Sequence, residues 1–187
     1  MEDDPVERYT RLLRTLPKPR EPPMVGATLF ELAAQEYRLS RPGASLVEFD
    51  QAGATYLFDL ASEEDQEERT VAAWAVSPAG ARARDTAYQR MYPMPPTPDE
   101  APVDRGHLVP HRSGGLFGPN IFRQDRALNR GWSPEGRAYR TLERLAAVPG
   151  AFFFGRLLYD DETSYPTHIE LVVLRGDDLR AARFRNR

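Results

Sequence analysis

The spacing of the apolar residues changes at residue 45, and this change limits the folds open to the chain. Before it, apolar side chains recur at helical intervals in two stretches, residues 5–16 and 27–38. After it, apolar and polar residues alternate through SLVEFDQAGATYLFDLA (45–61), which is typical of a β-hairpin. Helical spacing returns in the second half of the chain. Segments of both kinds predict an α+β fold, with helices and an antiparallel sheet.

The remaining segments can be assigned by the same reasoning. Further strands are expected at residues 69–77, 105–109, 151–160 and 167–174, and further helices at residues 80–92, 124–130 and 134–147. Proline-rich connections are expected at residues 16–23 and 91–102, and residues 177–187 form a basic tail with no assigned structure. We expect an N-terminal helical and proline-rich segment (1–44) and a main domain (45–187) that together form one compact unit.

Composition narrows the setting and the metal chemistry. The chain has no cysteine, which excludes disulfides and thiolate metal sites. A metal would have to be bound by His, Asn, Asp, Glu or water, which favours magnesium, manganese or calcium over zinc. No run of eighteen apolar residues predicts a membrane span, and the acidic start MEDDPVERYTRLLRTL does not read as a secretory signal. We expect a cytoplasmic location, with export by a specialised secretion system left open.

Charge is distributed unevenly along the chain. The net charge is −3, which by itself argues against a nucleic-acid partner. However, residues 1–100 carry 11 Lys and Arg against 18 Asp and Glu, whereas residues 101–187 carry 14 Arg against 10 acidic residues. A local basic surface matters more for phosphate binding than the total charge does. The second half could therefore bind a polyanion.

The polar residues are most concentrated between residues 104 and 143. Two of the three histidines lie there, His107 and His111, together with three amides, Asn120, Gln124 and Asn129. The segment and its margin also hold eight arginines: Arg105, Arg112, Arg123, Arg126, Arg130, Arg137, Arg140 and Arg144. This combination predicts a site for a phosphate group and a hard metal ion.

Phosphodiester hydrolysis requires a base of near-neutral pKa, cations that absorb the growing charge, and a metal at the leaving oxygen. Histidine is the side chain with a suitable pKa, which makes His107 the candidate base. Gly106 beside it is expected to let the substrate approach the backbone. Asparagine oxygens form a weak magnesium site that leaves most coordination positions to water and phosphate, as magnesium prefers.

Two sequence motifs together resemble those of a known protein family. DRGH at 104–107 and the pattern N-x3-Q-x4-N at 120–129 resemble the DNA/RNA non-specific endonuclease family, whose members are ββα-metal nucleases. The short connection between the two motifs resembles the compact bacterial branch of that family. The resemblance implies an antiparallel sheet with a ββα-metal element, and a Mg²⁺-dependent (or Mn²⁺-dependent) endonuclease acting on DNA and RNA.

The resemblance also implies roles for individual residues. His107 resembles the general base and Asn129 the single direct protein ligand of the metal. Arg105 resembles the arginine that stabilises the transition state, and Glu143 the glutamate that orders metal-bound waters. The amides Asn120 and Gln124 resemble those that support the metal-bearing helix and the substrate. The remaining candidates for substrate contact are Arg130 and Arg140.

Some assignments have alternatives. The gap between Asn129 and Glu143 is longer than is usual in the family, so Glu135 is a rival for the glutamate role. Arg105 could form an ordinary salt bridge with Asp104, and the helical arginines could be a solvated face. The amides could simply satisfy backbone groups in a loop. A zinc pair made by His107 and His111 is disfavoured because Pro110 prevents the helix that such a pair needs.

Alternatives for the whole chain also remain. The protein could be a catalytically inactive relative that binds nucleic acid or a protein partner. It could instead be an antibacterial toxin, with residues 1–40 as a docking or trafficking segment. A toxin of that kind would have an immunity or inhibitor protein as its partner.

Overall fold

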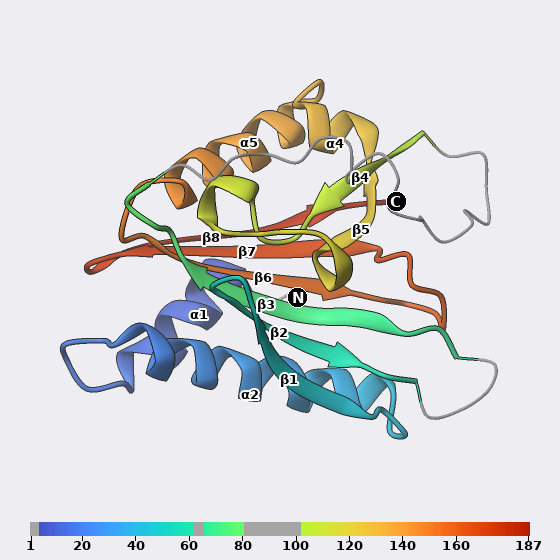
Figure 1. The fold of residues 1–187 in the computed structure, drawn as a ribbon, viewed down its shortest axis with the longest axis horizontal. Coiled ribbons are helices and arrows are strands. Elements are labelled where there is room, and N and C mark those ends of the chain that lie inside the picture. Colours follow the sequence, from blue (N-terminus) through green and yellow to red (C-terminus); the bar gives the residue numbers. More distant parts are fainter. Residues whose placement is uncertain (1–3, 62–65, 81–101) are drawn as a thin grey trace.

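A computed structural model describes residues 4–61, 66–80 and 102–187. Its centre is a six-stranded antiparallel sheet with the strand order β1-β2-β3-β6-β7-β8, and β4 and β5 form a separate two-stranded antiparallel sheet. Helices cover both faces of the main sheet (Figure 1). The predicted α+β class with an antiparallel sheet is confirmed.

The main sheet is built from two runs of consecutive strands, β1–β3 and β6–β8, with the small hairpin and helices α4 and α5 between them in the sequence. The strands are β1 (Leu46–Gln51), β2 (Ala54–Asp59), β3 (Arg69–Val76), β4 (Val103–His107), β5 (Ile121–Asp125), β6 (Phe152–Leu158), β7 (His168–Arg175) and β8 (Asp178–Arg185). The α-helices are α1 (Pro5–Arg14), α2 (Pro22–Ser40), α4 (Arg126–Arg130) and α5 (Pro134–Ala146). Two 3₁₀ turns, η1 (His111–Ser113) and η2 (Gly118–Asn120), lie between β4 and β5.

Helices α1 and α2 cover one face of the sheet, the lower face in Figure 1. Their apolar stripes contribute Tyr9, Leu29 and Ala33 to a core that also contains Phe154 and Val172 from the central strands. All five side chains are fully buried. The N-terminal segment predicted from helical spacing therefore packs directly onto the sheet, with the proline-rich stretch as the connection between its two helices.

The opposite face carries the β4–β5 hairpin, α4 and α5 (Figure 1). Here Tyr139 and Leu142 from α5 pack with Phe122 from β5 and with Phe153 and Leu171 from the main sheet. Because β4 and β5 stand on this core, the arrangement of the polar residues that they carry is fixed by packing beneath them. The segment singled out by its polar residues thus lies entirely on one side of the sheet.

Most of the predicted elements are confirmed, and the differences have physical reasons. Helix α2 begins at Pro22 rather than residue 27, since proline suits the first turn of a helix. Two strands were missed: β5, whose five residues are too few to display a period, and β8, whose arginines concealed its alternation. The helix predicted at 80–92 and most of the loop predicted at 91–102 lie outside the described residues.

Within the described part of the chain, no helix is both long and apolar enough to cross a membrane.

Candidate functional site

The hairpin sets the positions of the DRGH residues. In its register Asp104 is opposite Gln124, Arg105 is opposite Arg123, and His107, the last residue of β4, is opposite Ile121. Successive residues of a strand point to opposite sides. Asp104 and Gly106 therefore share the side that faces α4 and α5, whereas Arg105 and His107 share the other side.

The carboxylate of Asp104 links strand β4 to helix α4 by hydrogen bonds. It accepts hydrogen bonds from Arg126 Nε at 3.2 Å and from Arg130 Nε and Nη2 at 2.7 and 3.0 Å. Burial alone would raise the pKa of Asp104, but hydrogen bonds from Arg130, Asn129 and Arg126 outweigh it and lower that pKa below its ordinary value. The predicted alternative, a salt bridge between Asp104 and Arg105, is not found among the described residues.

Asn129 reaches the same carboxylate from α4. Its amide nitrogen donates to Asp104 Oδ2 at 3.1 Å, and in the part of the chain that the structure describes no donor is recorded for its side-chain oxygen. Helix α4 is capped by Asp125, which accepts from Leu128 N at 2.7 Å, so the position of Asn129 one turn later is well defined. The amide is thus oriented with its oxygen as the end that can bind a cation.

The chain that leaves His107 is held by Asn120, which is fully buried. Its side-chain oxygen accepts from Val109 N at 2.7 Å, and its amide nitrogen donates to the carbonyls of Val109 at 3.0 Å and Leu116 at 2.7 Å. Gly115 is required here, because a Cβ atom would lie 1.9 Å from the Val109 carbonyl oxygen. The Asn120 amide therefore fixes the turn behind His107, whose ring also lies 6.1 Å from the ring of Phe117.

Gln124 has a comparable supporting place beneath the hairpin. It is 1% exposed and lies next to Tyr139 of α5, whose pKa is raised chiefly by burial. A Cβ atom at Gly106 would lie 2.5 Å from Gln124 Oε1, so this glycine is needed for packing. This corrects the expectation that Gly106 lets the substrate approach. Because Asn120 and Gln124 are both buried, we assign them to support of the site in place of substrate contact.

Arg105 and Arg123 face each other across the hairpin, and each has a buried side-chain nitrogen for which no hydrogen bond is found among the described residues. In Arg105 this nitrogen is Nε. Arg123 is 1% exposed, lies 5.7 Å from the ring of Tyr165, and has its pKa lowered by burial. A guanidinium on the His107 side of β4 with an unsatisfied N–H is suited to an anionic ligand.

The two candidate glutamates both lie on helix α5 but have different neighbours. Glu143 is 18% exposed and lies 3.4 Å from Arg140 Nη1, one turn along the same helix. Glu135, in the first turn of α5, instead accepts from the backbone N–H of Arg185 at 2.7 Å and so ties α5 to β8. Both glutamates therefore have partners in the fold, and the choice of Glu143 for the role beside a metal stays a prediction.

Asn186 also supports the site, and sequence analysis overlooked it. Its amide nitrogen donates to the carbonyls of Arg123 at 2.9 Å and Pro166 at 2.8 Å, and its oxygen accepts from Asp125 N at 2.9 Å. These bonds fasten β5 to the end of the main sheet. An asparagine inside a basic tail gives no signal of such a role, because all of its partners are backbone groups far away in sequence.

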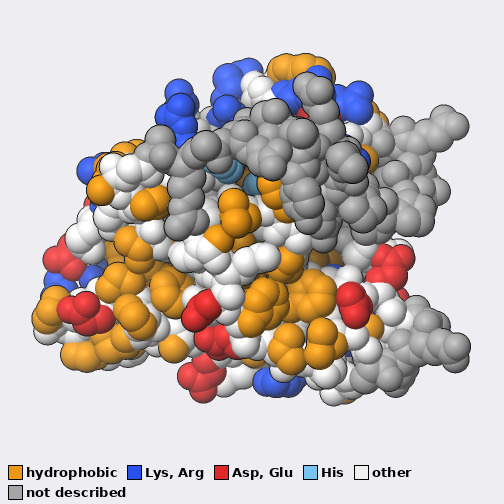
Figure 2. Space-filling view, viewed as in Figure 1, with side chains coloured by type: hydrophobic (Ala, Val, Ile, Leu, Met, Phe, Trp, Pro, Cys, Tyr) orange, Lys and Arg blue, Asp and Glu red, His pale blue; other side chains and the backbone are white. Residues whose placement is uncertain are grey.

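The predicted substrate-binding arginines lie on an exposed rim. The side chains of Arg130 and Arg140 are 46% and 55% exposed, although Asp104 and Glu143 respectively pair with them. Figure 2 shows Lys and Arg gathered along the upper edge formed by α4 and α5, whereas most of the visible Asp and Glu lie below it. The rim has the charge needed to attract a polyanion.

Another possible kind of metal site is a cluster of His, Asp or Glu side chains. Across 4–61, 66–80 and 102–187, no group of three or more His, Asp or Glu side chains could hold a metal ion. His111, the second histidine of the hypothetical zinc pair, begins η1, after β4 has ended at His107. A site with one amide ligand is of a different kind and depends on the geometry around Asn129.

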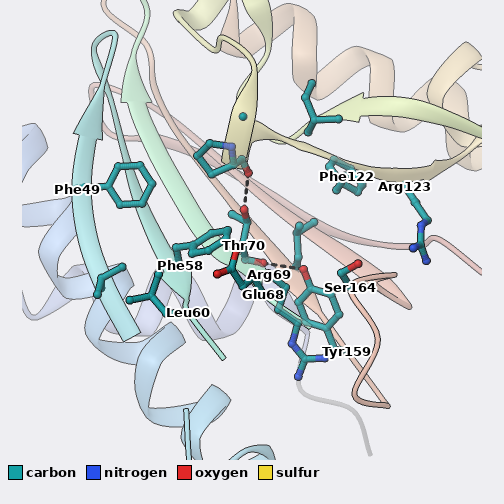
Figure 3. Close-up of a pocket in the computed structure, with 15 residues that line it drawn as sticks. Phe49, Phe58, Leu60, Glu68, Arg69, Thr70, Phe122, Arg123, Tyr159 and Ser164 are labelled. Atoms are coloured by element: carbon teal, nitrogen blue, oxygen red, sulfur yellow. Dashed lines mark hydrogen bonds between the residues drawn. The ribbon is translucent and has the colours of Figure 1, made fainter. Parts of the chain in front are cut away.

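A pocket of about 500 Å³ adjoins the hairpin (Figure 3). It lies between β1–β2 and the segment from η2 to β5, and Ile121, the cross-strand neighbour of His107, is in its wall. Thr70 donates to the Pro119 carbonyl across it, and Tyr159 donates to the Thr70 carbonyl at 2.7 Å. Its wall is largely apolar, so we do not assign the phosphate chemistry to it.

Comparisons with known proteins do not add a relative. No protein-family model matches the chain, and no curated protein matches it. Any assignment of function therefore depends on the motif residues and on the arrangement described above.

Proposed function

We propose that this protein is a divalent-metal-dependent nuclease of the ββα-metal type, which hydrolyses phosphodiester bonds of DNA and RNA. The observation that carries the proposal is the hydrogen bond from Asn129 to Asp104, which joins the candidate metal ligand to the strand that ends in His107. Asp104 and His107 are three residues apart, which is about 10 Å along a strand. Alternation along β4 puts these two side chains on opposite sides of the strand, so the proposal requires the hydrated cation and the phosphate to extend from Asn129 around the strand to His107.

In this proposal His107 is the general base. Its imidazole takes a proton from a water molecule, and the water oxygen forms a bond to phosphorus while the bond from phosphorus to the 3′ oxygen breaks. The products are a 5′ phosphate and a 3′ hydroxyl, the latter protonated from solvent. Arg105 lies on the same side of β4 as His107, and its guanidinium would stabilise the negative charge that grows on the phosphate.

The residues present fit a magnesium or manganese ion. The side-chain oxygen of Asn129 is a hard neutral ligand, and Asp104 orients it by accepting from the amide nitrogen. Glu143 would orient water around the ion. When bound, a divalent cation would supply charge stabilisation for the departing oxygen. Arg130 and Arg140 would contact the phosphate backbone, and contacts of that kind carry no base sequence information.

The first test is incubation of the purified protein with plasmid DNA and with RNA, in Mg²⁺ or Mn²⁺ and in chelator. Cleavage should require the metal, and His107→Ala should reduce the rate by on the order of 10²–10⁴-fold. His168→Ala is the matched control, because His168 begins β7 and hydrogen-bonds with Thr167. An equal loss in both variants, or cleavage unaffected by chelator, would contradict the proposal.

A second test addresses distance. The chain has three histidines, so their ring proton signals can be assigned by substitution. Paramagnetic Mn²⁺ bound at Asn129 should broaden the His107 signals. Broadening that persists in Asn129→Ala would remove Asn129 from the metal site.

The setting of the activity is a separate matter. We propose a cytoplasmic protein or one exported by a specialised system, and a toxin role would add an immunity protein as partner. Growth inhibition on expression that His107→Ala relieves would support the toxin role. Salt-sensitive DNA binding without any cleavage in Mg²⁺ or Mn²⁺ would instead support an inactive nucleic-acid-binding relative.

A further inference from the structure

Trp132 is an exposed aromatic residue in the connection between α4 and α5, three positions after Asn129. It is 63% exposed. Among the residues described, the other exposed large apolar side chains are aliphatic: Val6, Leu39 and Leu60. A tryptophan left in solvent loses the stabilisation that its burial would give, so its position calls for a binding explanation.

Arg130 holds a defined position relative to this ring. Its guanidinium carbon lies 5.0 Å from the Trp132 ring centroid, and its Nε and Nη2 are fixed on Asp104. The cation therefore covers part of the indole, and the high exposure leaves further ring surface for a second planar group. An indole beside a fixed guanidinium is an arrangement that binds nucleobases by stacking.

The charge around Trp132 identifies the kind of ligand. Arg137 and Arg140 follow on α5 and are exposed, and the Arg140 side chain also packs beside Gly131. The upper edge on which this connection lies is the basic edge of Figure 2. A neutral apolar ligand would gain nothing from these cations, whereas a polyanion that carries planar bases would use both features.

We propose that Trp132 is a stacking platform for an unpaired base, so that this protein binds single-stranded nucleic acid in preference to duplex. The inference rests on the proposed nuclease function and names its substrate class. The base stacks on the indole while neighbouring phosphates contact the arginines of the rim. A base inside a duplex is already stacked and paired, so Trp132 gives a duplex no comparable contact.

The test is a binding measurement in chelator, with a labelled thymidine oligonucleotide, an abasic oligonucleotide of equal length, and a hairpin duplex. The abasic strand keeps the phosphates and lacks the bases. The wild-type protein should bind the thymidine strand about 5- to 100-fold more tightly than the abasic strand. Trp132→Ala should lose that difference and bind the duplex within 2-fold of wild type, a range that falls well below one stacking contact. Trp132→Phe should keep much of it.

Leu39→Ala is the matched control, because Leu39 is 83% exposed and lies on α2, on the other face of the sheet. Equal binding of thymidine and abasic strands by the wild-type protein would overturn the proposal, even if Trp132→Ala failed to fold. A Trp132→Ala protein that binds the thymidine strand as the wild type does would overturn it as well. Since chelator is present, these outcomes are independent of cleavage, whose absence would overturn only the nuclease function.

Discussion

On the α1–α2 side of the main sheet three largely buried arginines surround the carboxylate of Glu170, whereas on the α4–α5 side the two arginines that pair with Asp104 reach solvent. Glu170 of β7 is fully buried and lies 2.6 Å from Arg8 and 2.9 Å from Arg183. Its third neighbour, Arg156, is 5% exposed. Arg126 and Arg130 on the other side also have a carboxylate, Asp104, yet their side chains are 41% and 46% exposed.

A count of arginines therefore does not distinguish those that stabilise the fold from those that can bind a ligand. The buried arginines form ion pairs with Glu170 and hold α1 against the sheet. The rim arginines keep part of the guanidinium in water, where a phosphate can reach it. Both groups consist of the same residue type. Burial and the identity of the neighbouring carboxylate, which come from the fold, decide between a structural role and a binding role.

The largest effect is expected at Glu170. Glu170→Gln leaves buried arginines without their negative partner and should lower the free energy of unfolding by about 3–5 kcal/mol, measured by urea denaturation. Glu162→Gln, which removes an exposed partner of Arg41, should cost less than about 1 kcal/mol. Equal losses would mean that the Glu170 cluster is not what holds this side together.

Asn120→Ala tests whether the α4–α5 side of the sheet depends on a buried amide, in the way that the α1–α2 side is expected to depend on the buried charge of Glu170. The substitution leaves the backbone groups of Val109 and the carbonyl of Leu116 unpaired, and should cost about 1–3 kcal/mol of unfolding free energy. Asn129→Ala is the comparison, because it should reduce nuclease activity and leave stability nearly unchanged. A stable Asn120→Ala protein with normal activity would remove Asn120 from the support of His107.

The two glutamates of α5 sharpen the assignment of the metal site. Glu143→Gln should reduce the rate of DNA cleavage by about 10- to 100-fold, since groups that orient metal-bound water have effects of that size. Glu135→Gln should change the rate by less than about 3-fold, well below that range, because Glu135 bonds to the backbone of Arg185. The reverse order of effects would transfer the role to Glu135.

The smallest effect concerns acid pH. The pKa of Asp104 is lowered in the folded protein, because hydrogen bonds from Arg130, Asn129 and Arg126 outweigh its burial. Its contribution to stability is therefore complete above its ordinary pKa of 3.8 and is lost as the pH falls through the lower folded value. Asp104→Asn should flatten that part of the stability curve. An unchanged slope below pH 4 would show that the arginines do not hold this carboxylate.

Much of the fold could be predicted from the sequence, because the apolar period is a local property. Helices α1, α2 and α5 and strands β1, β2, β3, β6 and β7 all follow it. Strand β8 does not, since its arginines face Glu170 and the solvent in place of a simple apolar core. Strand β5 is too short for a period to appear.

The residues of the candidate site come from the sequence motif and stay predictions, and the structure adds where each of them lies. The motif identified His107, Asn129 and Arg105, and the structure brings Asn129 to the DRGH strand through Asp104. Burial of Asn120 and Gln124 could not be read from their spacing. Nor could the contact between Trp132 and Arg130, because it depends on how α4 ends and α5 begins.

The hydrogen bonds from Asn186 connect residues that are 61 and 63 positions apart in the sequence. During synthesis the residues of the β4–β5 hairpin are added well before Asn186, whose hydrogen bonds hold the hairpin in place. Until β8 has paired with β7, the backbone groups of Arg123 and Asp125 must remain with water. The candidate site thus reaches its final form only after Asn186 has been synthesised and β8 has paired with β7.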